Sequence, residues 1–216
     1  MNGIKQNLTY LIEGKKTRFV IPVYQRNYDW KSDNCARLFD DLVEMVKDGR
    51  EEHFFGSIVS QTPHGERVII DGQQRITTVF LLFAAITKQL LDGMIVSDDP
   101  NLADIIEEDY LIDKRHKGDQ KLRLKLIKSD SAALEAVLED ACPTDASLPT
   151  PMLVKESSVT QNYLYFKGRL ASMTVGVDQL VDAIERLCVI DITLDPADDA
   201  QLIFESLNST GLDLSE

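Results

Sequence analysis

Hydrophobic side chains recur along the chain at two spacings, and these separate expected helices from expected strands. Apolar residues three or four positions apart predict helices over residues 33–46, 76–91, 101–110, 130–140, 157–172, 178–187 and 196–207, the last with Asp195 as its N-cap. Short apolar or alternating runs predict strands over 17–23, 53–61, 66–71, 121–126 and 188–192. The turn residues Pro63 and Gly65 separate two of these runs, so we expect a hairpin over 53–71.

The helix expected over 76–91 is apolar on nearly all its faces, which predicts a central position in the core. Expected strands dominate before it and expected helices dominate after it. We therefore predict an α+β fold, with a small mixed sheet and its helices in residues 1–95 and a mainly helical extension in residues 96–216.

Composition narrows the classes of function. The longest apolar run, 79–86, is too short to span a bilayer, and the first residues lack the pattern of a signal peptide. We therefore expect a cytoplasmic protein with no membrane partner. Cys35, Cys142 and Cys188 are isolated from one another and from histidine pairs, which favours buried thiols over disulfides or zinc ligands.

The formal net charge of −13 is unevenly distributed. Residues 1–75 carry 11 basic and 11 acidic side chains, whereas residues 76–216 carry 12 and 25. The first third of the chain can therefore present a locally basic surface to phosphates. Within the acidic part, a basic island could be the solvated side of a strand, which we favour, or a DNA contact; it comprises Lys114, Arg115, Lys117, Lys121, Arg123, Lys125 and Lys128.

The clearest chemical signal is the run Asp-Gly-Gln-Gln-Arg at 71–75, between an expected buried strand and the central helix. A strand, a glycine turn and a helix N-terminus in this order aim free backbone N–H groups and the positive end of the helix dipole at one point. Gly72 permits a sharp turn or a close approach by a ligand. The pattern is typical of a phosphate site, although neither a P-loop motif nor a Gly-x-Gly-x-x-Gly motif is present.

The side chains of this run suit the same chemistry. Arg75 offers a bidentate charged contact, Gln73 and Gln74 offer amide donors and acceptors, and Asp71 could hold Mg²⁺ or orient a water. The alternative is a tight structural turn in which Asp71 caps the helix and Arg75 forms an ion pair.

A second motif, residues 18–30, combines two Tyr, the only Trp, a Gln and two Arg. Aromatic side chains interleaved with Arg and Gln are suited to stacking on a base and hydrogen-bonding its edge or a phosphate. The alternative is a hydrophobic lid on the following helix, with Arg26 bridging to a carboxylate. We favour the lid for Trp30 and the functional interpretation for Gln25 and Arg26.

A third motif closes the chain over residues 203–216. Ile203, Phe204 and Leu207 are expected to face the core, and the polar run 208–211 could reach a ligand or simply end the helix. The chain stops where a new helix would begin, so we expect it to be a fragment of a longer protein.

In order, these motifs read Ile-Pro-x-Tyr-Gln-Arg-x-Tyr-x-Trp, Asp-Gly-Gln-Gln-Arg-x-Thr-Thr and Phe-x-x-Leu-Asn-Ser-Thr-Gly-x-x-Leu, and they span residues 18–216. The chain thereby resembles the N-terminal domain family of GmrSD-type restriction systems, and residues 162–167 look like a further family segment. The resemblance implies a ParB/sulfiredoxin-like α+β core with a helical extension. It also implies binding or hydrolysis of a nucleoside triphosphate with Mg²⁺, and recognition of modified DNA.

The resemblance also implies residue roles. The catalytic positions are Asp71, which is also the candidate Mg²⁺ ligand, Arg75 and Arg26. The nucleotide or phosphate contacts are Gly72, Gln73, Gln74, Thr77 and Asn208. The DNA or base contacts are Tyr24, Gln25, Tyr28 and Trp30. The sulfiredoxin branch has a Cys in the turn that holds Gln73 and Gln74 here, so reduction of cysteine sulfinic acid is disfavoured.

DNA cutting in such proteins is attributed to a C-terminal His-Asn-His nuclease, which would lie beyond Glu216, so we expect no cleavage by this chain. The expected function is a Mg²⁺-dependent NTPase, using GTP, ATP or CTP, that senses modified DNA and regulates a nuclease domain or partner subunit. The alternatives are a non-catalytic reader of DNA modification and a scaffold for a partner nuclease. A homodimer is an open alternative for the assembly.

Overall fold

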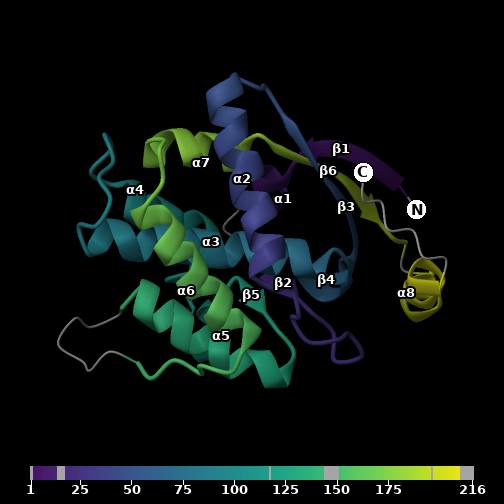
Figure 1. The fold of residues 1–216 in the computed structure, drawn as a ribbon. Coiled ribbons are helices and arrows are strands. Elements are labelled where there is room, and N and C mark those ends of the chain that lie inside the picture. The colour runs from purple at the N-terminus through teal and green to yellow at the C-terminus, as the bar shows by residue number, and fades with distance from the viewer. Residues whose placement is uncertain (1, 14–17, 117, 144–150, 196, 210–216) are drawn as a thin grey trace.

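A computed structural model describes residues 2–13, 18–116, 118–143, 151–195 and 197–209 (Figure 1). Six strands in these ranges form one mixed sheet in the order β1-β6-β3-β4-β2-β5. Their bounds are Asn2–Asn7 (β1), Arg18–Val20 (β2), His53–Gln61 (β3), Glu66–Asp71 (β4), Leu124–Lys125 (β5) and Leu187–Thr193 (β6). The pairs β1/β6 and β3/β4 are antiparallel, and the other neighbours are parallel.

The helices cover the two faces of this sheet unequally. The described α-helices are Leu8–Ile12 (α1), Ser32–Asp48 (α2), Gln73–Leu91 (α3), Leu102–Ile106 (α4), Lys128–Ala141 (α5), Ser158–Ala171 (α6), Val177–Glu185 (α7) and Ala200–Ser209 (α8). Helices α1 to α7 share one large core with Ile58 and Ile69 of the sheet. Helix α8 packs on the opposite face, against Val59 and Ile70, and lies apart from the other helices in Figure 1.

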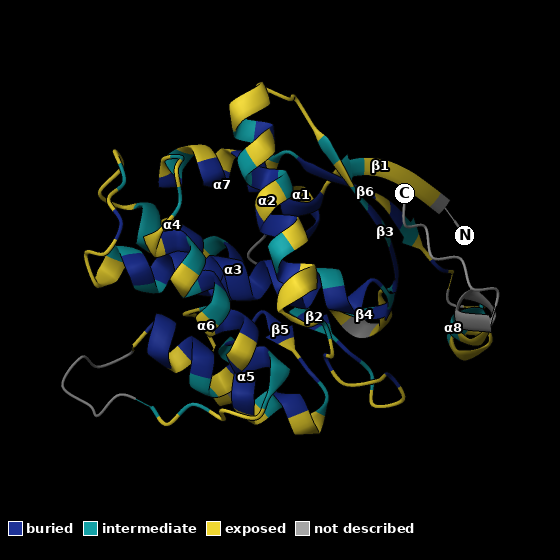
Figure 2. Cartoon of the chain, in the orientation of Figure 1, coloured by how far each residue is buried: buried dark blue, intermediate teal, exposed yellow. Residues whose placement is uncertain are grey.

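The predicted central helix is confirmed as α3, which lies in the middle of the large core. Apart from Arg75, its residues from Gln73 to Thr87 are all buried, and the helix is dark blue over most of its length in Figure 2. The Phe83 ring stacks on Tyr110 at 4.3 Å between ring centroids. Each large apolar side chain buried in this way stabilises the fold by about 1.5–3 kcal/mol relative to exposure.

Much of the predicted secondary structure is confirmed. The hairpin is formed by β3 and β4, and the helices expected over 33–46, 130–140, 157–172 and 178–187 are α2, α5, α6 and α7. The α+β class is also confirmed. The three cysteines are free and buried, as expected. No helix in the described ranges is long and apolar enough to cross a membrane.

Two helix starts differ from the prediction because other residues cap them. Helix α3 begins three residues early, since Gly72 adopts a left-handed conformation (φ 89°) and is the N-cap. The cap predicted at Asp195 is wrong. Helix α8 begins at Ala200, and Asp199 accepts hydrogen bonds from the N–H groups of Gln201 and Leu202 at 3.1 and 3.0 Å.

The strand predicted over 121–126 is reduced to β5 because Arg123 turns inward. Its side chain is buried and donates to the carbonyl oxygen of Glu108 at 2.7 Å, and burial lowers the pKa of its guanidinium. The edge strand β1 was not predicted, since its polar sequence carries no hydrophobic alternation. Strands β5 and β6 of the sheet lie after residue 95 in the sequence. The predicted domain boundary at residue 95 and the resemblance to ParB and sulfiredoxin folds stay predictions.

Candidate functional site

The turn between β4 and α3 is built around Gly72. A Cβ at this position would lie 2.4 Å from the Ile58 side chain and 3.0 Å from the carbonyl oxygen of Ser57, and φ is positive. Only glycine fits both the conformation and the space. The close packing brings the start of α3 directly against β3.

Arg75 extends from the first turn of α3 across β3. Its Nη1 donates to the carbonyl oxygen of Ser57 at 3.4 Å, and a Cβ on Gly56 would lie 2.7 Å from its Nε. Gly56 therefore leaves room for the guanidinium. Within the described residues neither Arg75 nor Asp71 forms an ion pair, and the Asp71 side chain makes no hydrogen bond to the start of α3. The structural alternative for these two side chains is not observed.

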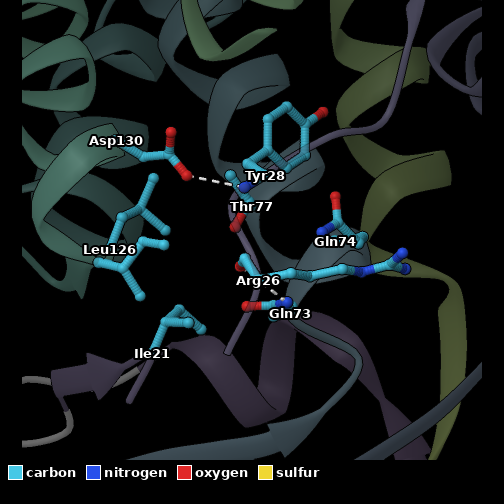
Figure 3. A pocket seen from close by; sticks show the side chains of 9 residues that line it. Ile21, Arg26, Tyr28, Gln73, Gln74, Thr77, Leu126 and Asp130 are labelled. Carbon is cyan, nitrogen blue, oxygen red and sulfur yellow. Dashed lines mark hydrogen bonds between the residues drawn. The ribbon is translucent and has the colours of Figure 1, made fainter. Parts of the chain in front are cut away.

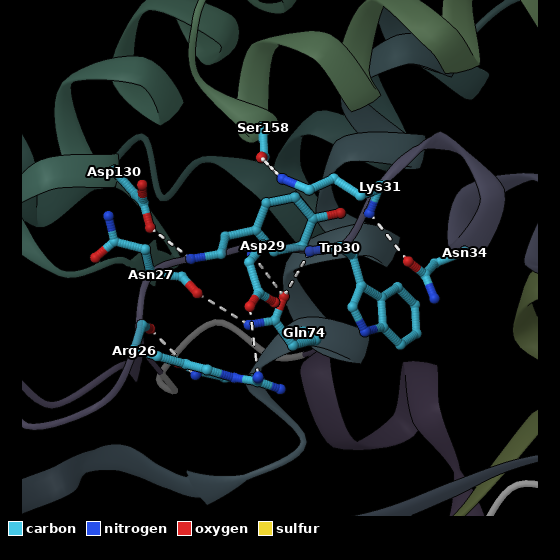
Figure 4. Close-up of polar contacts among 11 residues, drawn as sticks. Arg26, Asn27, Asp29, Trp30, Lys31, Asn34, Gln74, Asp130 and Ser158 are labelled. Carbon is cyan, nitrogen blue, oxygen red and sulfur yellow. Dashed lines mark hydrogen bonds and ion pairs between the residues drawn. The ribbon is translucent and has the colours of Figure 1, made fainter.

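Gln73 and Gln74 use their side chains to hold the second motif. Gln73 Nε2 donates to the carbonyl oxygen of Arg26 at 3.2 Å, and Gln74 Nε2 donates to that of Asn27 at 3.1 Å. Gln74 Oε1 accepts from the backbone N–H groups of Asp29 and Trp30 at 3.1 and 3.2 Å. The glutamines thus bind the backbone of residues 26–30, named here the Arg26 loop, and Figure 4 shows the contacts of Gln74.

Gln25 and Tyr28, predicted to contact DNA, are both buried. Gln25 Nε2 donates to the carbonyl oxygen of Ile70 at 2.7 Å. The Tyr28 hydroxyl accepts from Asn162 Nδ2 at 2.9 Å and lies 2.8 Å from Thr78 Oγ1, which donates to the carbonyl oxygen of Gln74. Burial raises the pKa of Tyr28 strongly. Both side chains have partners inside the protein, while their contact with DNA stays a prediction.

Arg26, Tyr24 and Trp30 differ in exposure. The Arg26 side chain is 64% exposed and reaches Asp29 at 3.4 Å, so the bridge to a carboxylate expected from the structural alternative is present, while the functional role of Arg26 stays a prediction. Tyr24 is 43% exposed, and its ring lies 6.2 Å from that of Phe204 on α8, which brings the third motif beside the second. Trp30 is half-buried against the large core, as expected for a lid. The Asn208 side chain lies outside the described residues.

A hollow of about 170 Å³, part of it open to solvent, lies beside the first turn of α3 (Figure 3). It is lined by Ile21, Arg26, Tyr28, Gln73, Gln74, Thr77, Leu126, Ile127 and Asp130. Thr77, predicted to contact nucleotide, is almost completely buried in its wall. Arg26 and the glutamines thus share this hollow, whereas Arg75 is directed toward β3.

Two polar residues of the site were not predicted. Asp130 accepts from the backbone N–H of Tyr28 at 2.7 Å, and burial raises the pKa of its carboxyl group. Asn162 donates to the Tyr28 hydroxyl and to the carbonyl oxygen of Trp30. Asn162 lies in a segment that resembles the family, so the sequence held a signal for it. Asp130 carried no such signal, because the helix dipole alone explains an Asp in the first turn of a helix.

Some side chains of the basic island form ion pairs with nearby carboxylates. Lys114 contacts Glu107 and Glu108 at 3.4 and 3.2 Å, and Arg115 contacts Asp113. These pairs neutralise part of the charge of the island. Arg123 is buried, so it does not lie on the solvated side of a strand as expected, and a DNA contact of the island stays an untested alternative. Among the described residues no three His, Cys, Asp or Glu side chains gather as a metal-binding group, so a cation here would depend on few protein ligands.

Comparison with known proteins gives one finding on the family. The family model described as GmrSD restriction endonuclease, N-terminal domain, matches residues 8–216. No curated protein matches the chain.

Proposed function

The chain belongs to the family of GmrSD restriction endonuclease N-terminal domains and has its role in a restriction system, and we propose that it binds and hydrolyses a nucleoside triphosphate at the start of α3. The phosphates lie against the turn from Asp71 to Arg75, with Arg75 and Arg26 opposing their charge. This activity regulates a nuclease in response to modified DNA.

The observation that carries the proposal is that two charged side chains at a glycine turn, Arg75 and Asp71, have no ionic partner among the described residues. Both side chains are half-buried. A charged group that is partly removed from water without a counter-charge is costly. Arg75 donates to the carbonyl oxygen of Ser57 at 3.4 Å but has no counter-charge among the described residues, and a bound phosphate would supply one.

The space beside α3 does not enclose a nucleotide. The hollow of about 170 Å³ includes open solvent and has almost no enclosed volume, unlike the pockets of roughly 300–1,000 Å³ that surround drug-sized ligands. Gln73 and Gln74 are buried under the Arg26 loop, so an anion approaches α3 at the edge of this loop. The base would then lie outside the hollow.

The side chains of the turn and of the Arg26 loop have separate roles in the proposed site. Arg75 and the exposed Arg26 bind phosphate oxygens, and the α3 dipole adds positive potential. Asp71 would hold Mg²⁺, which typically uses one or two carboxylates beside phosphate oxygens. When bound, Mg²⁺ neutralises charge that develops on the phosphates. Gln73 and Gln74 hold the Arg26 loop, and their contact with the nucleotide stays a prediction.

Hydrolysis assays test the proposal. Purified protein is assayed with GTP, ATP and CTP in Mg²⁺, with and without modified DNA. We expect Arg75→Ala to lower kcat/KM by about tenfold to a hundredfold, the loss of one charge-assisted hydrogen bond. Arg75→Lys should retain part of the activity. The exposed Arg37→Ala on α2 is the matched control. An Arg75→Ala protein with normal turnover would sink the proposal.

A second candidate function, a non-catalytic reader of modified DNA, is favoured by the exposed side of the second motif. Val23 is 89% and Tyr24 43% exposed, beside the exposed Arg26, and aromatic rings next to Arg are suited to stacking on a base. Salt-sensitive DNA binding that Tyr24→Ala weakens, with no nucleotide turnover by the wild type, would favour the reader over the NTPase.

A further inference from the structure

Residues 27–31 are also held by two helices outside the three motifs. The start of α5 and the start of α6 both meet this segment (Figure 4). Asp130 on α5 accepts from the backbone N–H of Tyr28 at 2.7 Å. Asn162 on α6 donates from the same Nδ2 to the carbonyl oxygen of Trp30 at 2.8 Å and to the Tyr28 hydroxyl at 2.9 Å.

These contacts are buried, which gives them weight. Asp130 is 7% exposed and Asn162 is 2% exposed. A polar group buried away from water costs free energy when its partner is removed, so the loop cannot exchange these partners freely for solvent. Two further contacts, Ser129 to Asn27 and Lys31 to Ser158, are both 3.1 Å long and exposed, so they contribute less.

Helices α5 and α6 are themselves joined by a buried polar contact. The Tyr163 hydroxyl on α6 donates to Asp140 on α5 at 2.6 Å, and Lys167 lies 3.6 Å from the same carboxylate. Because these contacts fix α5 and α6 to each other, Asp130 and Asn162 bind the Arg26 loop from two helices that are held together.

The loop is therefore held through its backbone by three helices, while the Arg26 side chain projects from it. Gln73 and Gln74 bind it from α3, and Asp130 and Asn162 bind it from α5 and α6. We infer that Asp130 and Asn162 are positioning residues that fix the Arg26 loop over the α3 N-terminus and so determine where Arg26 meets its ligand. Only the consequence for nucleotide affinity rests on the proposed function.

The only tryptophan of the chain, Trp30, reports on the loop without interference. Intrinsic emission and acrylamide quenching are measured for Asp130→Ala and Asn162→Ala. We expect both variants to show red-shifted emission and a higher quenching constant, because Trp30 leaves its half-buried position. We also expect about tenfold weaker binding of Mg-NTP, equivalent to one hydrogen bond.

Two controls separate positioning from other roles. Asp130→Asn keeps an acceptor for the Tyr28 N–H and should restore the wild-type emission and quenching. Glu135→Ala, an exposed change on the same helix, should match the wild type. Thermal unfolding shows which variants fold, and where one alanine variant does not fold, the other carries the test.

The outcomes are distinct. Wild-type quenching in folded Asp130→Ala and Asn162→Ala would overturn the inference. Failure of both to fold while Asp130→Asn folds would also overturn it, because these residues would then support the whole fold rather than the loop. If the wild type binds no nucleotide, the proposed function fails, but the Trp30 measurement still decides the positioning role.

Discussion

At the scale of single residues, side chains that suit a ligand can instead hold the protein together. The two glutamines after Gly72 show this clearly. Their amides match nucleotide chemistry in the sequence, but in the structure they bind the backbone of the Arg26 loop. Sequence alone could not make this distinction, because the loop and Gln74 are joined by bonds that span 44 to 47 positions.

Gln74→Ala should destabilise the protein more than a matched change on the same helix. It removes one amide donor and one oxygen that accepts two hydrogen bonds, and it leaves partly buried backbone groups without these partners. We therefore expect a loss of about 1–3 kcal/mol in the free energy of unfolding. Gln89→Ala removes a single bond, from Gln89 to the carbonyl oxygen of Lys167, and serves as the control. Equal losses in urea unfolding would contradict the role given to Gln74.

Gly72→Ala should lower the stability of the protein for two reasons. Gly93→Ala is the control that separates these two reasons. Both glycines have a positive φ, which costs an alanine about 1–2 kcal/mol. Only at Gly72 would the new methyl group also meet Ile58 and Ser57, since the space around Gly93 is open. Thermal unfolding should therefore show a larger loss for Gly72→Ala, and losses of the same size would refute the close packing described here.

At the scale of elements, hydrophobic periodicity predicted the hairpin, the central helix and most other helices, because burial decides their position. It failed where a polar contact decides. Arg123 turns inward to a carbonyl oxygen and shortens a strand, and Asp199 caps α8 four residues beyond the predicted cap. Asp130 could not be recognised as part of the site, because its partner Tyr28 lies 102 positions earlier in the chain.

The carboxyl group of Asp130 gives the start of α5 a defined pH dependence. Burial raises its pKa above the ordinary 3.8, with the Asp29 charge acting in the same direction and the Tyr28 N–H opposing it. The folded state then binds the proton more tightly than the unfolded chain does. Stability from this group is therefore present below 3.8 and falls as the pH rises through the folded pKa.

Asp130→Asn removes this titration and keeps the acceptor. We expect the free energy of unfolding of the variant, relative to the wild type, to rise between about pH 3.5 and pH 7. Taking the difference cancels the titration of all groups that the substitution leaves unchanged. A difference that is flat, or that falls with pH, would show that burial does not control the ionisation of this carboxyl group.

At the scale of the whole molecule, the fold brings segments from far along the chain to one turn. The Arg26 loop packs on the start of α3, Tyr24 contacts Phe204 of α8, and α5 and α6 also bind the loop. The resemblance of the motifs predicted their common site, whereas composition and periodicity did not. The support from α5 and α6 required the tertiary structure, because it depends on contacts between distant segments.

The central claim is that Arg26 and Arg75 together bind the phosphates of a nucleotide at the start of α3. Equilibrium dialysis of labelled GTP, ATP and CTP in Mg²⁺ tests it most directly, with the wild type, Arg26→Ala, Arg75→Ala, the double variant and Arg37→Ala. We predict saturable binding of at least one nucleotide by the wild type and Arg37→Ala, about tenfold weaker binding for each single variant, and weaker binding still for the double variant. Wild-type affinity in the folded double variant would contradict the claim.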